Sequence, residues 1–161
     1  MVCLPGTQPT EPMKLPRVFP PIWFLANISL ILALRRFMPT PLALPEFHLV
    51  AGQVLIWSGV VTVLTALLSF RRHRTTVVPF RNPETLIRIG IFRWSRNPIY
   101  LGEAFILAGL CTKFDQALPW LILPLFIIGL NRLVIKWEET TLRTQFGSDY
   151  AAYCANTRRW L

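Results

Sequence analysis

Acidic residues, cysteine and histidine are scarce in this chain. It has 8 Asp and Glu residues against 17 Lys and Arg, with 3 cysteines and 2 histidines. Cys3, Cys111 and Cys154 lie far apart without CxxC or Cys/His spacing, so neither a disulfide framework nor a bound metal is expected. The sequence has no G-x-G-x-x-G or Walker pattern, and nucleotide binding of the soluble type is therefore unsupported.

Apolar residues, in contrast, are abundant. They make up 53% of the 161 residues, and the mean hydropathy is +0.44, which is too apolar for an ordinary soluble domain of this size. The net charge of +9 also occurs in nucleic-acid-binding proteins, but here the basic residues flank long apolar runs. The composition predicts an integral membrane protein that is surrounded by lipids and binds no nucleic acid.

Four apolar runs predict an all-α fold with about four transmembrane helices. Residues 1–21 contain six prolines and are expected to form a flexible cytoplasmic lead. Residues 22–74 hold the first two spans. The run from Ile22 to Leu34 is only just long enough to cross a bilayer, whereas Phe47 to Phe70 is 24 residues without a charge, about 36 Å of helix.

The remaining residues, 75–161, are predicted to hold a helical hairpin whose last helix extends into the cytoplasm. Apolar runs at 98–113 and 118–135 are joined by a tight polar turn, and the following sequence stays compatible with a helix until Gly147. Seven arginines precede the hairpin, which places their loop in the cytoplasm under the positive-inside rule. Four spans then put both termini on the same side.

The third span is predicted to begin at Pro98, because proline suits the first helical position and Asn97 is a good N-cap residue. The free amide groups of this helix start, with Arg93 and Arg96 just upstream, would form a positive mouth for a carboxylate or phosphate. The alternative is that Asn97 and Pro98 only start a helix and the arginines only fix the topology.

The hairpin is expected to bring Tyr100 and Glu138 to a similar depth, because about 17 residues remain for each leg once the turn is subtracted. Arg96, Asn97 and Glu139 would join them near the cytoplasmic boundary. These cationic, carboxylate, phenol and backbone N–H groups together suit a zwitterionic ligand.

Helical spacing separates the two adjacent glutamates. Glu139 shares a helix face with basic neighbours, among them Lys136 and Arg143, which predicts a solvated ion-pair face. Glu138 has no cation on its own face, so we expect it to contact a ligand ammonium or ribose hydroxyl. The alternative partner of Glu138 is an arginine of the central loop.

Glu103 lies one helical turn beyond Tyr100, inside the predicted third span. A charged side chain is costly at that depth, so Glu103 is expected to face the interior of the site. The alternative is a position shallow enough for Glu103 to reach water at the lipid headgroups.

Three spaced blocks stand out in the second half of the chain: G-I-F-R-W-S-R-N-P-I-Y-L-G at 90–102, W-E-E-x-x-L at 137–142 and F-G-S-D-Y-A-A-Y at 146–153. Together they resemble the integral-membrane methyltransferases of the isoprenylcysteine carboxyl methyltransferase and phospholipid methyltransferase superfamily. The resemblance covers residues 75–161. It departs at Asn97, where isoprenylcysteine enzymes tend to have histidine, and at the ending T-R-R-W, where V-P-R-W-like sequences are common.

The resemblance implies a methyltransferase that binds S-adenosylmethionine at the cytoplasmic end of its last helices. A lipophilic or lipid-anchored acceptor would enter from the bilayer, and an isoprenylcysteine carboxylate, a phospholipid amine, an isoprenoid and a small thiol all remain open. The implied catalytic residues are Glu103, Tyr100 and Arg96, with Glu103 as the group that takes a proton from the acceptor. The implied cofactor-binding residues are Arg93, Arg96, Asn97, Pro98, Tyr100, Leu101, Gly102, Glu138 and Glu139.

Two other functions fit parts of the pattern. Sterol and isoprenoid reductases that use NADPH have a similar C-terminal half, but a chain of 161 residues lacks the additional spans of those enzymes. A four-helix membrane protein without catalytic activity is the second alternative.

Overall fold

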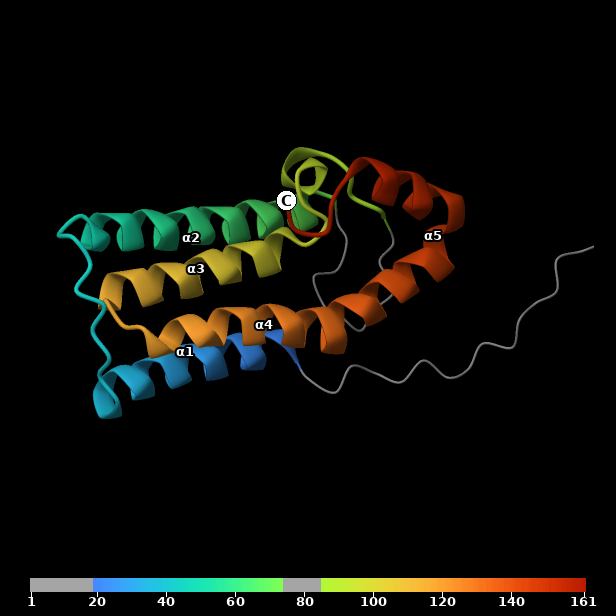
Figure 1. The fold of residues 1–161 in the computed structure, drawn as a ribbon. Coiled ribbons are helices and arrows are strands. Elements are labelled where there is room, and N and C mark those ends of the chain that lie inside the picture. The colour runs from blue at the N-terminus through green and yellow to red at the C-terminus, as the bar shows by residue number, and fades with distance from the viewer. Residues whose placement is uncertain (1–18, 74–84) are drawn as a thin grey trace, which may run out of the picture.

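The computed structural model describes residues 19–73 and 85–161, and most of these residues are helical (Figure 1). Five α-helices follow one another along the chain: α1 (Pro20–Phe37), α2 (His48–Arg72), α3 (Pro98–Phe114), α4 (Ile122–Leu130) and α5 (Lys136–Asn156). The described residues contain no strand beyond an isolated bridge between Pro41 and Gln116. The predicted all-α fold is confirmed for this part of the chain.

Shorter helical turns connect these elements. 3₁₀ turns occur at Gly90–Arg93 and Leu118–Leu121, and a π-helical turn at Asn131–Ile135 joins α4 to α5. Most of the predicted N-terminal lead and the loop arginines Arg74 and Arg81 lie outside the described residues. The lead was predicted to extend to residue 21, but α1 already begins at Pro20, because proline is well suited to the first helical positions.

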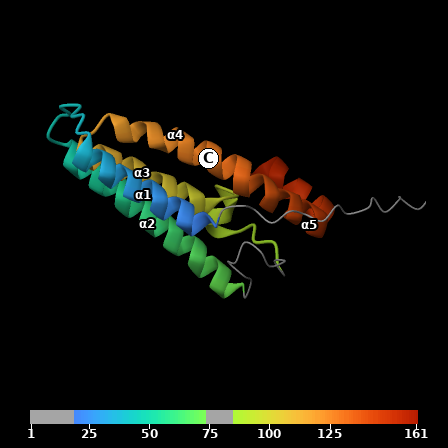
Figure 2. The ribbon, with the colours of Figure 1, turned by 90° about the horizontal axis from the view of Figure 1, so that it is seen from below.

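Helices α1 to α4 lie side by side and alternate in direction, and the predicted hairpin of α3 and α4 is confirmed (Figures 1 and 2). Helix α5 continues the line of α4 beyond the end of the bundle. It turns back at Gly147, where φ of 50° and ψ of −121° interrupt the helix, a conformation that suits glycine because it has no Cβ. The last residues therefore return to the start of α3.

Helices α2 and α3 approach each other at two pairs of glycines. Gly52 faces Gly109 and Gly59 faces Gly102, so each helix contributes glycines seven residues apart. A Cβ built on Gly59 would lie 2.5 Å from the carbonyl oxygen of Gly102, and one on Gly109 would lie 2.8 Å from that of Gly52. Small residues that let helix backbones touch are a common packing device in membranes.

Replacement of Gly59 by leucine is expected to destabilise the protein by at least about 1 to 3 kcal/mol, because the new side chain would meet backbone atoms of α3. Ser58→Leu is the matched control, since Ser58 is exposed on the same helix and a substitution there costs within about 0.5 kcal/mol. Thermal unfolding of both variants in one detergent measures the difference. Equal melting temperatures would contradict the close packing.

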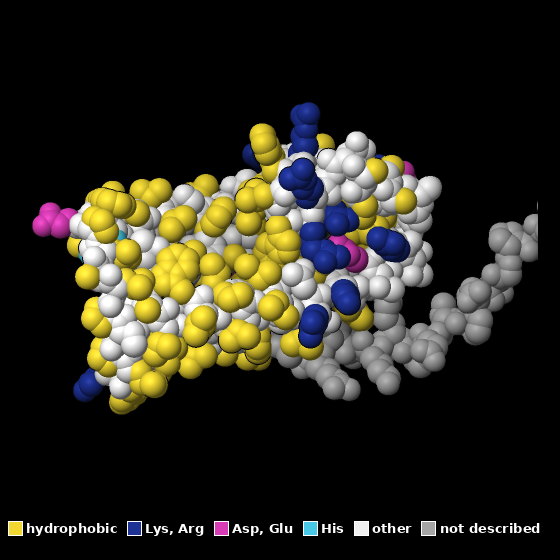
Figure 3. Space-filling view, in the orientation of Figure 1, with side chains coloured by type: hydrophobic (Ala, Val, Ile, Leu, Met, Phe, Trp, Pro, Cys, Tyr) yellow, Lys and Arg dark blue, Asp and Glu magenta, His cyan; other side chains and the backbone are white. Residues whose placement is uncertain are grey.

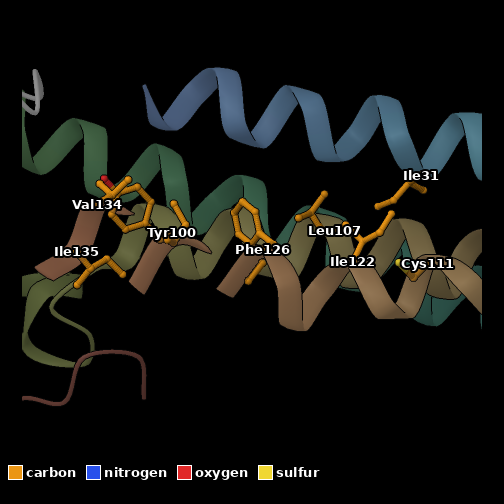
Figure 4. Packing of buried hydrophobic residues seen from close by; sticks show 10 residues of the cluster. Ile31, Tyr100, Leu107, Cys111, Ile122, Phe126, Val134 and Ile135 are labelled. Carbon is orange, nitrogen blue, oxygen red and sulfur yellow. The ribbon is translucent and has the colours of Figure 1, made fainter. Parts of the chain in front are cut away.

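The main core lies between α3, α4 and α1. Figure 4 shows Tyr100 beside Val134 and Ile135 at one end of this core, with Cys111 at the other end. Phe126 is fully buried between them. Because Tyr100 belongs to the core, packing fixes its ring. Its hydroxyl group can therefore form a hydrogen bond at the end of the bundle.

Two helical stretches are long and apolar enough to cross a membrane: α2, and the continuous run Leu118–Asn156 that contains α4. Helices α1 and α3, with 18 and 17 residues, are shorter. In Figure 3 hydrophobic side chains cover the visible face of the bundle, and most of the visible Lys and Arg side chains gather at the end where α5 leaves it. The predicted number of four spans remains a prediction.

Candidate functional site at the charged end of the bundle

The start of α3 lies at this charged end. Helix α3 begins at Pro98, as predicted, but Asn97 does not cap it through its side chain. The Asn97 amide Nδ2 instead donates a hydrogen bond to the carbonyl oxygen of Arg159, at 3.2 Å. The expected side-chain cap at Asn97 is therefore wrong, because the amide is oriented by its bond to Arg159 and its Oδ1 atom accepts no hydrogen bond from the first turn of α3.

Residues 157–161, which we call the terminal strap, run along the segment that precedes α3. The backbone N–H of Arg96 donates to the carbonyl oxygen of Arg158 at 3.0 Å, and the Ser95 hydroxyl donates to that of Arg159 at 3.1 Å. Trp160 packs against the main core. Nothing in the sequence pattern predicted this contact, because T-R-R-W differs from the usual superfamily ending and carries no other signal.

Glu139 is buried between two arginines. Its Oε1 lies 3.3 Å from an Arg96 guanidinium nitrogen, and its Oε2 lies 2.6 Å from one of Arg159. Only 11% of the Glu139 side chain is exposed. The expectation of a solvated ion-pair face at Glu139 is therefore wrong. The hydrogen bonds from Arg159 to Glu139 raise the pKa of the Arg159 guanidinium.

Glu138 points to a different partner. It accepts a hydrogen bond from the Tyr100 hydroxyl at 2.9 Å, which agrees with the similar depth predicted for the two residues. None of the ion pairs in the described part of the chain includes Glu138. Helix α5 thus presents one neutralised glutamate and one glutamate that has no cationic partner among the residues the structure describes.

Glu103 lies one turn further along α3 and is buried, as expected for a carboxylate in this helix. Among the described residues its buried Oε2 atom has no hydrogen-bond partner, and Glu103 lies within electrostatic range of Glu138. Tyr100, Glu103 and Glu138 therefore form an acidic cluster. An unpaired carboxylate oxygen is costly to bury, and such atoms are typical of sites that hold a ligand or a proton.

The other predicted site residues take different places. Pro98 and Leu101 are buried in the first turn of α3, and the side chain of Arg93 is exposed. Gly102 lies against Gly59 and Val63 of α2. Close packing of α2 on α3 explains why glycine is required at position 102. A contact between Gly102 and a cofactor remains a prediction.

The charged end of the bundle thus contains two carboxylate sites with different electrostatic environments. In the first, Glu139 is neutralised by two guanidinium groups. In the second, the acidic cluster faces no cation among the described ion pairs, although a buried carboxylate is stable only when it is paired, hydrogen-bonded or protonated. The acidic cluster is therefore suited to a cationic ligand.

These features define a helical, membrane-associated protein with a polar site at one end of an apolar bundle. The sequence matches the phospholipid methyltransferase family over residues 47–149, more than half of the chain, and the protein belongs to this family. An uncharacterized protein of Haemophilus influenzae is 36% identical over 63 residues, which are 39% of this chain and all of that protein. The family match confirms the resemblance read from the sequence blocks, and membership implies methyltransferase activity.

Proposed function

We propose that the protein uses S-adenosylmethionine to methylate a lipophilic acceptor at the surface of the membrane. The observation that carries this proposal is the acidic cluster of Tyr100, Glu103 and Glu138. Its carboxylates have no cation partner in the described part of the chain, although they lie at the end of an apolar bundle. Membership in the phospholipid methyltransferase family supports the same reaction class.

The residues present fit the charges of adenosylmethionine, which carries an ammonium, a sulfonium and a carboxylate. Glu138, held in place by Tyr100, is suited to the ammonium group. The ligand carboxylate fits the start of α3, where the buried Nε–H group of Arg96 has no partner in the described part of the chain, although its other nitrogens contact Glu139 and Cys154. When bound, adenosylmethionine supplies a methyl group to a nucleophile of the acceptor.

Glu103 is the proposed proton acceptor. The unpaired Oε2 atom is buried beside Glu138 and close to the apolar core, where it meets an acceptor that arrives from the bilayer. An amine or thiol acceptor gives up a proton when it is methylated, and a carboxylate held 3 Å away accepts it. A carboxylate acceptor needs no such step, so the requirement for Glu103 distinguishes the acceptor classes.

Binding experiments test this function. Adenosylmethionine or its demethylated product should raise the melting temperature of the purified protein, because a ligand at a hundred times its Kd stabilises the folded state by about 2.7 kcal/mol. NADPH is the matched alternative ligand, and a shift with NADPH alone would support the reductase function. A methyl-labelled donor incubated with the protein and a total membrane extract then identifies the acceptor.

The proposal includes four spans, with the site on the cytoplasmic side. Single cysteines at Glu46 and Ser148, both exposed at opposite ends of the bundle, provide the measurement once the native cysteines are replaced by serine. A membrane-impermeant maleimide should label the cysteine at position 46 from outside intact cells and the one at position 148 only after lysis. Labelling of both positions from the same side would rule out this arrangement.

A further inference from the structure

The terminal strap places Arg159 where it can control the orientation of α5. The strap is held through its backbone, because the carbonyl oxygen of Arg159 accepts hydrogen bonds from Ser95 Oγ at 3.1 Å and Asn97 Nδ2 at 3.2 Å. The Arg159 side chain extends from this fixed backbone to Glu139. We infer that Arg159 is a positioning residue that fixes the first turn of α5, and this inference rests on the proposed donor site at Glu138.

The contact between Arg159 and Glu139 is a bidentate one. Arg159 Nε lies 3.0 Å from Oε1 of Glu139, and a terminal guanidinium nitrogen lies 2.6 Å from Oε2. A planar guanidinium paired in this way fixes direction as well as distance. Arg96 contacts the same carboxylate through a single nitrogen at 3.3 Å, so Arg159 supplies most of the geometric restraint.

Glu138 and Glu139 are neighbours on one turn of α5, and they are held from two different directions. Glu138 contacts Tyr100 of α3, whereas Glu139 contacts the strap. Any rotation of this turn about the helix axis moves both carboxylates together. Arg159 therefore acts on the donor site through Glu139, without touching the acidic cluster itself.

A second contact of Arg159 supports this role. One of its terminal nitrogens lies 3.5 Å from the side-chain oxygen of Asn131, which opens the π-helical turn Asn131–Ile135 between α4 and α5. π-helical turns often occur at functional sites, because they change the phase of a helix. Arg159 thus contacts both the start of the π-helical turn and the first turn of α5.

Arg158 offers a matched control. It lies beside Arg159 and has the same charge, but its side chain is exposed and only its backbone takes part in holding the strap. Arg159→Gln should weaken binding of the demethylated donor product ten- to a hundredfold in calorimetric titration of the full chain, whereas Arg158→Gln should change it less than twofold. Arg159→Lys keeps the charge without the bidentate geometry and should give an intermediate loss.

A double-mutant cycle separates positioning from a merely structural effect. If Arg159 acts through the orientation of Glu138, Arg159→Gln should weaken binding less than threefold further in a Glu138→Gln background. Additive losses, or wild-type affinity in Arg159→Gln, would overturn the inference. Equal losses of affinity in Arg158→Gln and Arg159→Gln would also overturn the inference.

Cys154 gives a measurement that needs no donor. It is half-buried and contacts the Arg96 guanidinium next to the strap. In a Cys3→Ser background, Arg159→Gln should increase the rate of maleimide labelling of Cys154 several-fold, and Arg158→Gln should not. If the two variants show this difference but the wild-type protein binds no donor, the proposed function fails while the strap assignment stands. Equal labelling rates in all variants would overturn the strap assignment.

Discussion

Glu139→Gln is expected to lower the free energy of unfolding by about 3 to 5 kcal/mol, the usual cost of leaving a buried charge without its partner. The substitution removes the carboxylate that separates two guanidinium groups, those of Arg96 and Arg159. Arg96 has a side chain only 13% exposed, so water compensates little of the loss. Thermal or denaturant unfolding in a single detergent measures the change.

The double variant Glu139→Gln/Arg159→Gln provides the control for this prediction. Removal of Arg159 eliminates one of the two repelling cations, so the double variant should be more stable than Glu139→Gln alone. A loss below about 1 kcal/mol in the single variant would instead indicate a solvated surface pair, which is what the spacing of basic residues along α5 suggested.

The error at Glu139 has a definite physical origin. Spacing along one helix identifies which side chains share a face, but it does not identify what packs on that face. One of its two partners, Arg159, lies 20 residues further on and reaches Glu139 only because Gly147 reverses the chain. A glycine at that position predicts the end of a helix, whereas the direction of the chain after it depends on tertiary contacts.

The parts of the site that were predicted correctly depend on local rules. Proline at position 98 fixes where α3 begins, and the lengths of the apolar runs bring Tyr100 to the depth of Glu138. Burial of Glu103 follows from the cost of a charge beside apolar neighbours. None of these three features requires knowledge of which helices are in contact.

The packing of α2 on α3 could not be predicted from local sequence rules. The spacing of seven between Gly52 and Gly59, and again between Gly102 and Gly109, is visible in the sequence. The pairing of the two sets is not, because it depends on the antiparallel approach of the helices. The resemblance implied a contact between Gly102 and the cofactor, and this contact remains a prediction; the neighbours of Gly102 across the helix interface are Gly59 and Val63 of α2.

Glu138→Gln should reduce donor affinity ten- to a hundredfold, in line with about 1.5 to 3 kcal/mol for a hydrogen bond to a charged group. The glutamine keeps the size of the side chain and can still accept the hydrogen bond from Tyr100, so the fold should be preserved. What it loses is the negative charge that the proposed donor ammonium would meet.

The measurement is calorimetric titration of the demethylated donor product into Glu138→Gln and into Glu46→Gln, an exposed carboxylate at the opposite end of the bundle. The control should bind as the wild type does, because more than a Debye length separates Glu46 from the site. Undiminished binding in Glu138→Gln would show that this carboxylate does not face the ammonium. Glu103, the other carboxylate of the acidic cluster, would then be the residue that compensates the positive charge, and Glu103→Gln in the same titration would carry the loss.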